Sequence, residues 1–546
     1  MPRYIDNCRA LLFNEIIEHS LEQIDSALNS LSNAIPISDN RSTLNKFSDY
    51  LAIYCDQSVL PAVAYLISEL KNGVEVQNIS EYTAYQSLFI KDSKLGILPK
   101  TFKNQFNFYN QQLETHINNL TLGFIKCLKR FAYDIPVIKE YFKQPLNKIS
   151  FIEPVGSDSH NCGEQVYRFR FDNGFSIFYK PRSLKNENLI TELMNEIGFD
   201  GSVIPRAYTK ESYGWAEGLH FKALSNTQDI KNFWKRTGTT VAFCDALNFT
   251  DGHFENILAT KTSIKIVDAE TFFHNTKQIF SETEERSLLL TGFLQNLEDG
   301  DDEIPMMGGL QVYGSNRYHY VYPHPIHERS LNLEVKMRGK VHSAPMNQPI
   351  QNLKFQPPAN HLSSFLDGLE KGYLQLQSNK NKIKSFLICN KDNFSFARQI
   401  VRATLYYAYI IRLLEQPELV RTVNDAQKVA RKKLQLVHSD FKSLSTDPNL
   451  LIDYELNCLI NKDIPVFYCH PFSRDLIDGT GKIYPQYFQS TAFEQITNFF
   501  ECLDDAYITR QKQLASHHLR PLDENCDVSE EEISLILKNE GDPYGL

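Results

Sequence analysis

The feature that most constrains the fold is the alternating stretch "QVYRFRFDNGFSIFYKP" at residues 165–181. Apolar and polar side chains alternate on both sides of Asp172, Asn173 and Gly174. Such a turn between two alternating runs predicts an antiparallel hairpin with a left-handed turn position. The second strand of this hairpin would end at Lys180. We therefore expect an antiparallel sheet that carries an amine at the end of one strand.

Helical periodicity surrounds this hairpin. Residues 1–148 repeat apolar side chains at helical spacing, which predicts a helical N-terminal region. Residues 149–295 hold the hairpin, further helices and the short buried strand "SIKIVD". Residues 296–360 are rich in Gly, Pro, Asn and acidic side chains and predict an irregular insert, whereas helical patterns return over 361–546. The expected fold class is α+β in these four regions.

Composition narrows the function classes. At 546 residues with a net charge of -9, the chain favours several sub-domains and disfavours nucleic acid or an anionic membrane as the main partner. No run reaches the roughly 18 apolar residues of a membrane span. The ten cysteines are scattered, which indicates reduced thiols and a cytoplasmic protein. The pair Cys469-His470 has no further ligands nearby and does not predict a zinc site.

A polar loop and a short strand follow in "NFTDGHFENILATKTSIKIVDAETFFH". Phosphoryl transfer needs a carboxylate to orient the acceptor hydroxyl, with an Asn and a second Asp to hold magnesium. Asp251 and Asn256 stand five apart with His253 between them, and Asp268 and Glu270 follow the strand. This is the kinase-type spacing. The alternative interpretation is a polar turn with an N-cap Asp in front of an ordinary strand.

The polar loop "GSDSHNCG" precedes the hairpin and contains Asp158 and His160. Loop amides and a strand lysine are the groups that cover ATP phosphates in a kinase-like lobe. Lys180 would supply that amine, with Glu192 or Glu196 of the following helix as its ion-pair partner. The alternative for Lys180 is a solvated lysine at a strand end.

Three arginines occur in "FARQIVRATLYYAYIIRLL", a segment that predicts a helix, and the first two are Arg398 and Arg402. On a helix Arg398 and Arg402 share one face, and Thr404 follows Arg398 by six residues. A pair of arginines suits a phosphate oxyanion. An amphipathic helix with a charged face is the alternative.

Taken together and in this order, the motifs resemble the dehydratase domain of class II lanthipeptide synthetases (LanM type). The resemblance covers roughly residues 150–475 and is carried by these stretches: "SDSHNCG", "YKPRSL", "GWAEGLHF", "FWKRTGTTVAFCDALNFTDGHFENILA", "IKIVDAETFF", "RQIVRATLYYAYIIRLLEQPELVR" and "NKDIPVFY". It implies a lipid-kinase-like core that phosphorylates Ser and Thr of a precursor peptide with ATP and Mg2+. The same site then eliminates phosphate to leave dehydroalanine or dehydrobutyrine.

The resemblance also implies roles for single residues. By position they are the loop and nucleotide residues Asp158, His160 and Lys180, the catalytic-loop residues Asp251, His253 and Asn256, the metal-binding residues Asp268 and Glu270, and the elimination pair Arg398 and Thr404. We add Arg402 and Glu192 as expected nucleotide contacts and Asn256 as a metal ligand. Gly252, Ala269 and Val466 depart from the side chains that the family usually has, and leucine is usual at the first of these.

The expected partner is a precursor peptide with a leader and a core that contains Ser or Thr. The family's synthetases continue into a cyclase domain, so we expect a stand-alone dehydratase that leaves ring formation to a separate cyclase or another tailoring enzyme. Two alternatives stay open. One is a peptide kinase that does not eliminate phosphate, and the other is a non-catalytic scaffold that binds the leader.

Overall fold

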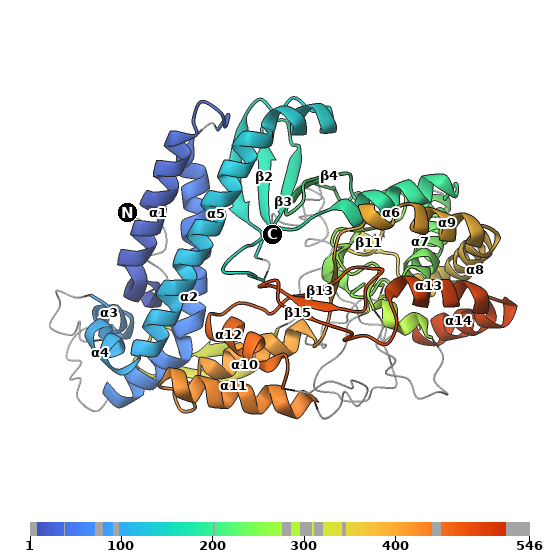
Figure 1. Cartoon of the computed structure of the whole chain (residues 1–546). Coiled ribbons are helices and arrows are strands. Elements are labelled where there is room, and N and C mark those ends of the chain that lie inside the picture. Colours follow the sequence, from blue (N-terminus) through green and yellow to red (C-terminus); the bar gives the residue numbers. More distant parts are fainter. Residues whose placement is uncertain are drawn as a thin grey trace.

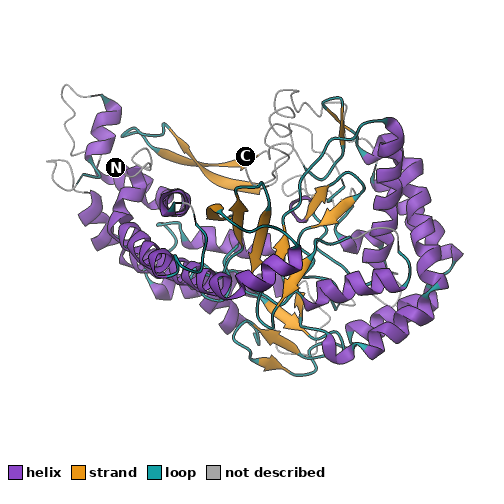
Figure 2. Ribbon diagram, turned by 90° about the horizontal axis from the view of Figure 1, so that it is seen from above, coloured by secondary structure: helices purple, strands orange, loops and turns teal. Residues whose placement is uncertain are grey.

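The computed structural model describes most of the chain. The described residues are 8–37, 39–70, 80–90, 98–156, 158–199, 203–275, 286–294, 308–310, 320–340, 346–438 and 449–519. They form a mixed helical and antiparallel-sheet structure, so the expected α+β class is confirmed. Figure 2 shows the strands in the middle of the molecule with helices on either side.

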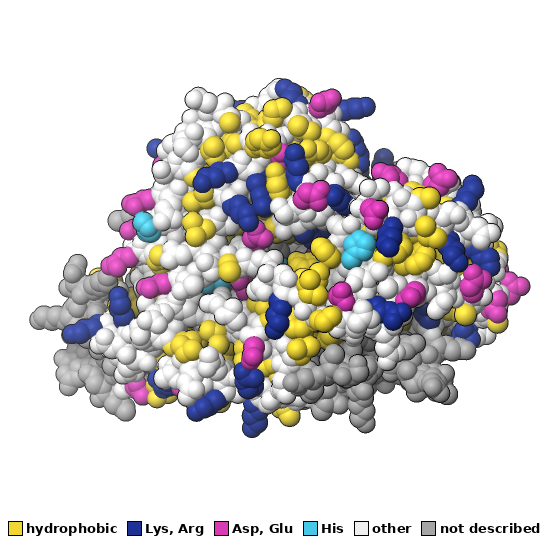
Figure 3. Space-filling view, in the orientation of Figure 1, with side chains coloured by type: hydrophobic (Ala, Val, Ile, Leu, Met, Phe, Trp, Pro, Cys, Tyr) yellow, Lys and Arg dark blue, Asp and Glu magenta, His cyan; other side chains and the backbone are white. Residues whose placement is uncertain are grey.

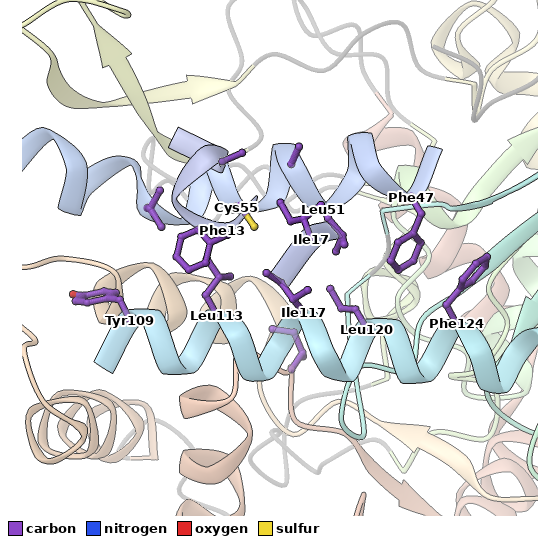
Figure 4. Packing of buried hydrophobic residues seen from close by; sticks show 14 of the residues in the cluster. Phe13, Ile17, Phe47, Leu51, Cys55, Tyr109, Leu113, Ile117, Leu120 and Phe124 are labelled. Carbon is purple, nitrogen blue, oxygen red and sulfur yellow. The ribbon is translucent and has the colours of Figure 1, made fainter. Parts of the chain in front are cut away.

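Three helices form the N-terminal layer: α1 (Asn14–Ser30), α2 (Asn40–Leu70) and α5 (Asn107–Phe142). They run side by side in Figure 1, and Figure 4 shows their apolar faces packed together. The shorter elements here are η2 (Cys8–Phe13), α3 (Glu81–Ser87) and α4 (Leu98–Gln105). Burial of apolar side chains between the long helices is what stabilises this layer.

The first sheet lies against α5. Its strand order is β1-β2-β3-β5-β4, and every neighbouring pair is antiparallel. The strands are β1 (Ile149–Pro154), β2 (Tyr167–Phe171), β3 (Ser176–Lys180), β4 (Ala207–Thr209) and β5 (Gly214–Glu217). The predicted hairpin is confirmed as β2–β3, with Gly174 at a φ of 82° in its turn. Phe131 of α5 stands 4.3 Å from Phe169 and 5.3 Å from Trp215 between ring centroids, so aromatic packing fixes the sheet on the helix.

The chain contains a second group of helices, separate from the N-terminal layer. It comprises α6 (Lys185–Glu196), α7 (Thr227–Ala246), α8 (Leu362–Ser378), α9 (Lys380–Cys389), α13 (Ala492–Cys502) and α14 (Asp505–His518). α7 and α8 approach closely because glycines line their contact: a Cβ on Gly238 would lie 2.1 Å from the Phe365 carbonyl oxygen. α7 leads into η4 (Phe254–Asn256) and the small hairpin β6 (Ile257–Ala259) and β7 (Ile264–Ile266). The expectation of further helices in residues 149–295 and the predicted strand "SIKIVD" are confirmed by α6, α7 and β7.

A second sheet corrects one prediction. Its strands are β12 (Ala397–Gln399), β13 (Phe467–Cys469), β14 (Leu476–Asp478) and β15 (Ile483–Tyr484), and three helices adjoin it: α10 (Thr404–Leu414), α11 (Val423–His438) and α12 (Ile452–Ile460). The single helix expected through Arg398, Arg402 and Thr404 is wrong. Residues 397–399 pair with β13 instead, and the helix begins only at Thr404.

The segment expected to be irregular also contains strands. β8 (Tyr320–Ile326) and β9 (Glu334–Lys340) form an antiparallel hairpin, and β10 (Ile350–Gln351) pairs with β11 (Lys354–Phe355). The expectation of an irregular insert is therefore wrong for residues 320–340. The remaining short elements are η5 (Leu288–Thr291), η6 (Pro358–His361) and η7 (Lys391–Asn393).

One helix of the described chain passes a membrane-span test by length and composition. It is α2, over Asn40–Glu69, and 61% of the tested window is buried inside the protein. The sequence predicted no segment of this kind, whereas α2 is long and apolar enough by length and composition. A mostly buried core helix of a soluble protein passes the same test, so one such helix is weak support for a span.

Candidate functional site

The β6–β7 hairpin brings the two halves of the predicted loop together. Asn256 lies in η4 directly before β6, and its carbonyl oxygen accepts a hydrogen bond of 2.9 Å from the Val267 amide that follows β7. Asp268 is the residue after Val267, so this hydrogen bond brings its backbone close to that of Asn256. The hairpin thus aligns two side chains that are twelve residues apart in sequence.

Asp251 and its neighbours form a hydrogen-bonded loop. The Asn256 amide donates to the Asp251 carbonyl at 2.9 Å and to its carboxylate at 3.2 Å. One ring nitrogen of His253 lies 3.0 Å from the Asp251 carboxylate, and the other lies 3.3 Å from Glu255. Burial opposes the charge on His253, but these two carboxylates raise its pKa to about 10. The ring is therefore a cation near neutral pH, held against Asp251.

Gly252 is explained by a close backbone contact. Its amide donates to the Thr291 carbonyl oxygen at 2.8 Å, and a Cβ at this position would lie 2.6 Å from that same oxygen. On the other side, a Cβ on Gly309 would lie 2.0 Å from the Gly252 carbonyl oxygen. The loop is thus packed against both backbone segments. The Thr291 oxygen and the rings of Phe249 and Phe293, each 3.2 Å from the Cβ position, leave no room for a side chain at residue 252.

Lys180 ends β3 and turns toward β7. Its ammonium group donates to the Val267 carbonyl at 2.7 Å and to the Asp268 carboxylate at 3.0 Å. Glu192 and Glu196 are exposed on α6. The prediction that one of them pairs with Lys180 is therefore wrong, because Asp268 takes that place.

Arg182 is a site residue that the sequence analysis did not single out. Its guanidinium donates to Asp268 at 2.7 Å, lies 3.1 Å from Glu270 and pairs with the buried Glu187 of α6. The signal was present in "YKPRSL", since residues two apart in an extended chain point to the same side. Burial opposes ionisation of Asp268, but Lys180 and Arg182 hold its pKa well below the usual range.

Arg398 joins the site from β12. Its backbone amide donates to the Glu270 carbonyl oxygen at 3.0 Å, and its guanidinium donates to the Glu270 carboxylate. A continuous chain of ion pairs results, which runs Lys180–Asp268–Arg182–Glu270–Arg398. Thr404 begins α10 and is half-buried, and its hydroxyl makes no hydrogen bond among the described residues.

The loop with His160 docks on the segment before β13. The Nδ1 atom of His160 lies 2.8 Å from the Ile464 carbonyl oxygen, and Asp463 accepts a 2.6 Å bond from the Ser159 hydroxyl and a 2.8 Å bond from the Cys162 amide. Burial, followed by the charge of Arg398, lowers the pKa of His160. Asp158 is exposed beside it. Figure 3 shows this face of the molecule hollowed below the first sheet, with Lys and Arg side chains near the hollow.

Tyr468 is a second residue that the sequence analysis missed. It faces Arg398 across the β12–β13 pair. Burial and then the charge of Glu270 raise its pKa to about 12, so its phenol stays protonated near neutral pH. No local spacing could have found it, because it reaches the site through a strand pairing with a partner 70 residues away.

Arg402 lies apart from this network. Its guanidinium makes bonds of 2.7 Å and 3.1 Å to Glu455, and both side chains are sealed from solvent at 1% and 0% exposure. Tyr407 donates to the same carboxylate at 2.7 Å. Arg402 therefore stabilises the contact of β12 and α10 with α12, and the structure does not place it with Arg398 on one face.

Comparison with known proteins agrees with the sequence motifs. Residues 107–470 match the model of a family described as a domain of unknown function (DUF4135). The lacticin 481/lactococcin biosynthesis protein LcnDR2 of Lactococcus lactis subsp. lactis is 20% identical over 473 residues. The match covers 82% of this chain and 49% of that protein, so the chain spans about half the length of this curated relative. These findings confirm the resemblance to LanM-type lanthipeptide synthetases.

Proposed function

The chain belongs to the DUF4135 family, and from this membership we propose that it dehydrates Ser and Thr side chains of a ribosomally made precursor peptide. The reaction has two steps in one lipid-kinase-like core, phosphorylation by ATP and then β-elimination of phosphate. The observation that carries this proposal is the ion-pair chain from Lys180 to Arg398. It joins the residues suited to the first step to those suited to the second.

The first step would use the loop around Asp251. The Asp251 carboxylate would orient the acceptor hydroxyl, and His253 and Asn256 bond this carboxylate. Lys180 supplies a cation for the nucleotide phosphates. Lys180 ends β3, Asn256 directly precedes β6, and the 2.7 Å hydrogen bond from Lys180 to the Val267 carbonyl links the two elements, which limits their motion during the transfer.

Magnesium would neutralise the polyphosphate during transfer. Among the described residues no three His, Cys, Asp or Glu side chains gather as a metal site. Mg2+ in such enzymes is bound by one or two side chains together with phosphate oxygens and water. Asn256 beside Asp268 fits that requirement. Glu270 fits it less well, because each of its carboxylate oxygens already meets an arginine.

The second step would use His160 and Arg398. Elimination breaks the Cβ–O bond, whose electrons leave with phosphate, and a base takes the proton from Cα. The His160 Nδ1–H donates to a carbonyl, so Nε2 keeps a lone pair in the neutral ring. Arg398 stabilises the departing phosphate. Thr404 is the further residue that the family resemblance assigns to this step, and Asp158 is exposed in the same loop as His160.

Mass spectrometry of a precursor peptide incubated with ATP and Mg2+ tests the proposal. Asp251→Asn should leave the peptide unmodified, whereas Arg398→Ala should accumulate the phosphopeptide. The matched control is Arg431→Ala, which removes an exposed arginine and should dehydrate like the wild type. Full dehydration by both site variants would contradict the assignment.

The same assay separates the alternatives. A peptide kinase without elimination would stop at the phosphopeptide even in the wild type. A leader-binding scaffold would show no heat of binding when ATP and Mg2+ are titrated into it. A separate cyclase, if one acts on the product, would then form rings only from peptide that this protein has dehydrated.

A further inference from the structure

Glu270 is held between two guanidinium groups. Its Oε2 atom lies 3.1 Å from Nε of Arg182, and its Oε1 atom accepts a hydrogen bond from Nη1 of Arg398. The side chains of Arg182, Arg398 and Glu270 keep 15%, 14% and 13% of their surface exposed. Each carboxylate oxygen therefore meets a different arginine at a place that solvent still reaches.

The two arginines are arranged as in an anion-binding site, and the anion bound there is the carboxylate of Glu270 itself. Two arginines that converge on one carboxylate present the donors that a phosphate dianion prefers, because a phosphate has more acceptor oxygens and more charge. We propose that Arg182 and Arg398 form a phosphate-binding site that Glu270 fills in the free protein. On the proposed function, from which this follows, its ligand is the phosphate of a phosphoserine or phosphothreonine side chain awaiting elimination.

The two arginines contribute differently. Arg182 keeps Glu187 and Asp268 as partners when Glu270 moves away, so its guanidinium stays in place. Glu270 is the ion-pair partner of Arg398 among the described residues. Displacement of Glu270 therefore removes this ion pair and leaves only the more distant charges of Asp251 and Asp268 near Arg398, so that a phosphate dianion can take the vacated position.

A second arginine–glutamate pair in the chain shows why exposure matters. In that pair Arg402 bonds both carboxylate oxygens of Glu455, and the two side chains are sealed at 1% and 0% exposure. No ligand reaches that carboxylate. The pair at Glu270 is open, and it lies one ion pair away from Asp268. A phosphate transferred beside Asp268 would thus lie next to Arg182, whose guanidinium is 2.7 Å from the Asp268 carboxylate.

Titration of inorganic phosphate into the full chain without ATP tests this site directly. Arg182→Ala should bind phosphate about tenfold more weakly, which corresponds to the loss of about 1.4 kcal/mol for one charged hydrogen-bonding partner. Arg182→Lys should restore part of this affinity, and Arg431→Ala should bind like the wild type. Glu270→Gln should bind more tightly, because the internal competitor has lost its charge. A folding defect produces no such gain.

Elimination from a synthetic phosphoserine peptide gives the second readout and bypasses phosphorylation. Arg182→Ala should raise the KM for this peptide more than it lowers kcat. Equal phosphate affinity of Arg182→Ala and the wild type would overturn the inference. So would a loss in Lys180→Ala as large as that in Arg182→Ala, since phosphate would then bind at the nucleotide end. Phosphate binding without dehydration of any precursor would keep this site and reject the proposed function.

Discussion

His253 lies between two carboxylates, and this position determines how its charge responds to pH. Its pKa is raised to about 10, so the stabilisation from the charged ring is complete below the ordinary histidine pKa of about 6.5 and is lost as the pH rises through about 10. His253→Gln should therefore lower the melting temperature most at about pH 6, and the difference from wild type should shrink toward about pH 10. Thermal unfolding across this range measures it. A difference that does not change with pH would contradict the assignment.

Because Arg402 lies in a sealed ion pair, we expect its replacement to lower the stability of the protein rather than its activity. Removing one partner of a sealed ion pair leaves the other charge buried, so Arg402→Ala should lower the free energy of unfolding by about 3–5 kcal/mol. Chemical denaturation measures this loss. Arg431→Ala, whose ion-pair partner is exposed, should cost less than about 1 kcal/mol. A small effect of Arg402→Ala would mean that Glu455 finds another partner.

Local spacing predicted the site only in part. Asp251, Asn256 and Asp268 were found because a short hairpin turns sequence spacing into contact. The expected pairing of Glu192 with Lys180 failed because Asp268 is the partner of Lys180, and the role of Arg402 was misread because it is buried against a distant partner. The sequence around an arginine does not reveal a Glu455 that lies 53 residues further on.

At the scale of elements, the docking of the His160 loop on residues 462–464 leads to a prediction. Asp463 accepts from the Ser159 hydroxyl and the Cys162 amide on either side of His160. Asp463→Asn should disturb this loop. On the proposed function it should slow elimination about 10- to 100-fold, because His160, the proposed base, is misplaced. Phosphopeptide should accumulate in the mass spectrum while phosphorylation continues.

The matched control for this loop is Asp453→Asn. Asp453 is 83% exposed and pairs with Arg431 rather than with the His160 loop, so the variant should eliminate phosphate at the wild-type rate. An unchanged rate in Asp463→Asn would show that His160 holds its position by other contacts, such as its bond to Ile464.

Elements with local signals were predicted well, and elements with distant partners were not. The β2–β3 hairpin and α7 follow from alternation and helical periodicity within each segment. β12 was read as helix because its partner strand, β13, lies about 70 residues away. Strand pairing at that separation overrides local propensity.

At the scale of the whole molecule, one apolar core crosses the expected boundary between residues 148 and 149. Side chains of α1, α2 and α5 pack in the same cluster as those of β1–β3 and α10–α12. The N-terminal helices and the first sheet should therefore unfold together. Leu113→Ala on α5 should cost about 2–5 kcal/mol and shift helical circular dichroism and tryptophan fluorescence equally.

Leu122→Ala is the control on the same helix. Leu122 is 60% exposed, so its loss should change stability by less than about 0.5 kcal/mol. The fluorescence is read in a Trp234→Phe background, so that Trp215 alone reports on the sheet. If Leu113→Ala then shifted the dichroism without the fluorescence, the helical layer would be an independent unit.

Gly252 has a consequence for protein engineering. A common route to a more stable variant replaces an unusual residue by the one that its relatives carry, and leucine is usual at this position. Here the backbone oxygen of Thr291 and the rings of Phe249 and Phe293 occupy the space that a side chain would need. Gly252→Leu should therefore destabilise this protein. A library built from family averages would need to leave the position untouched or redesign all three segments together.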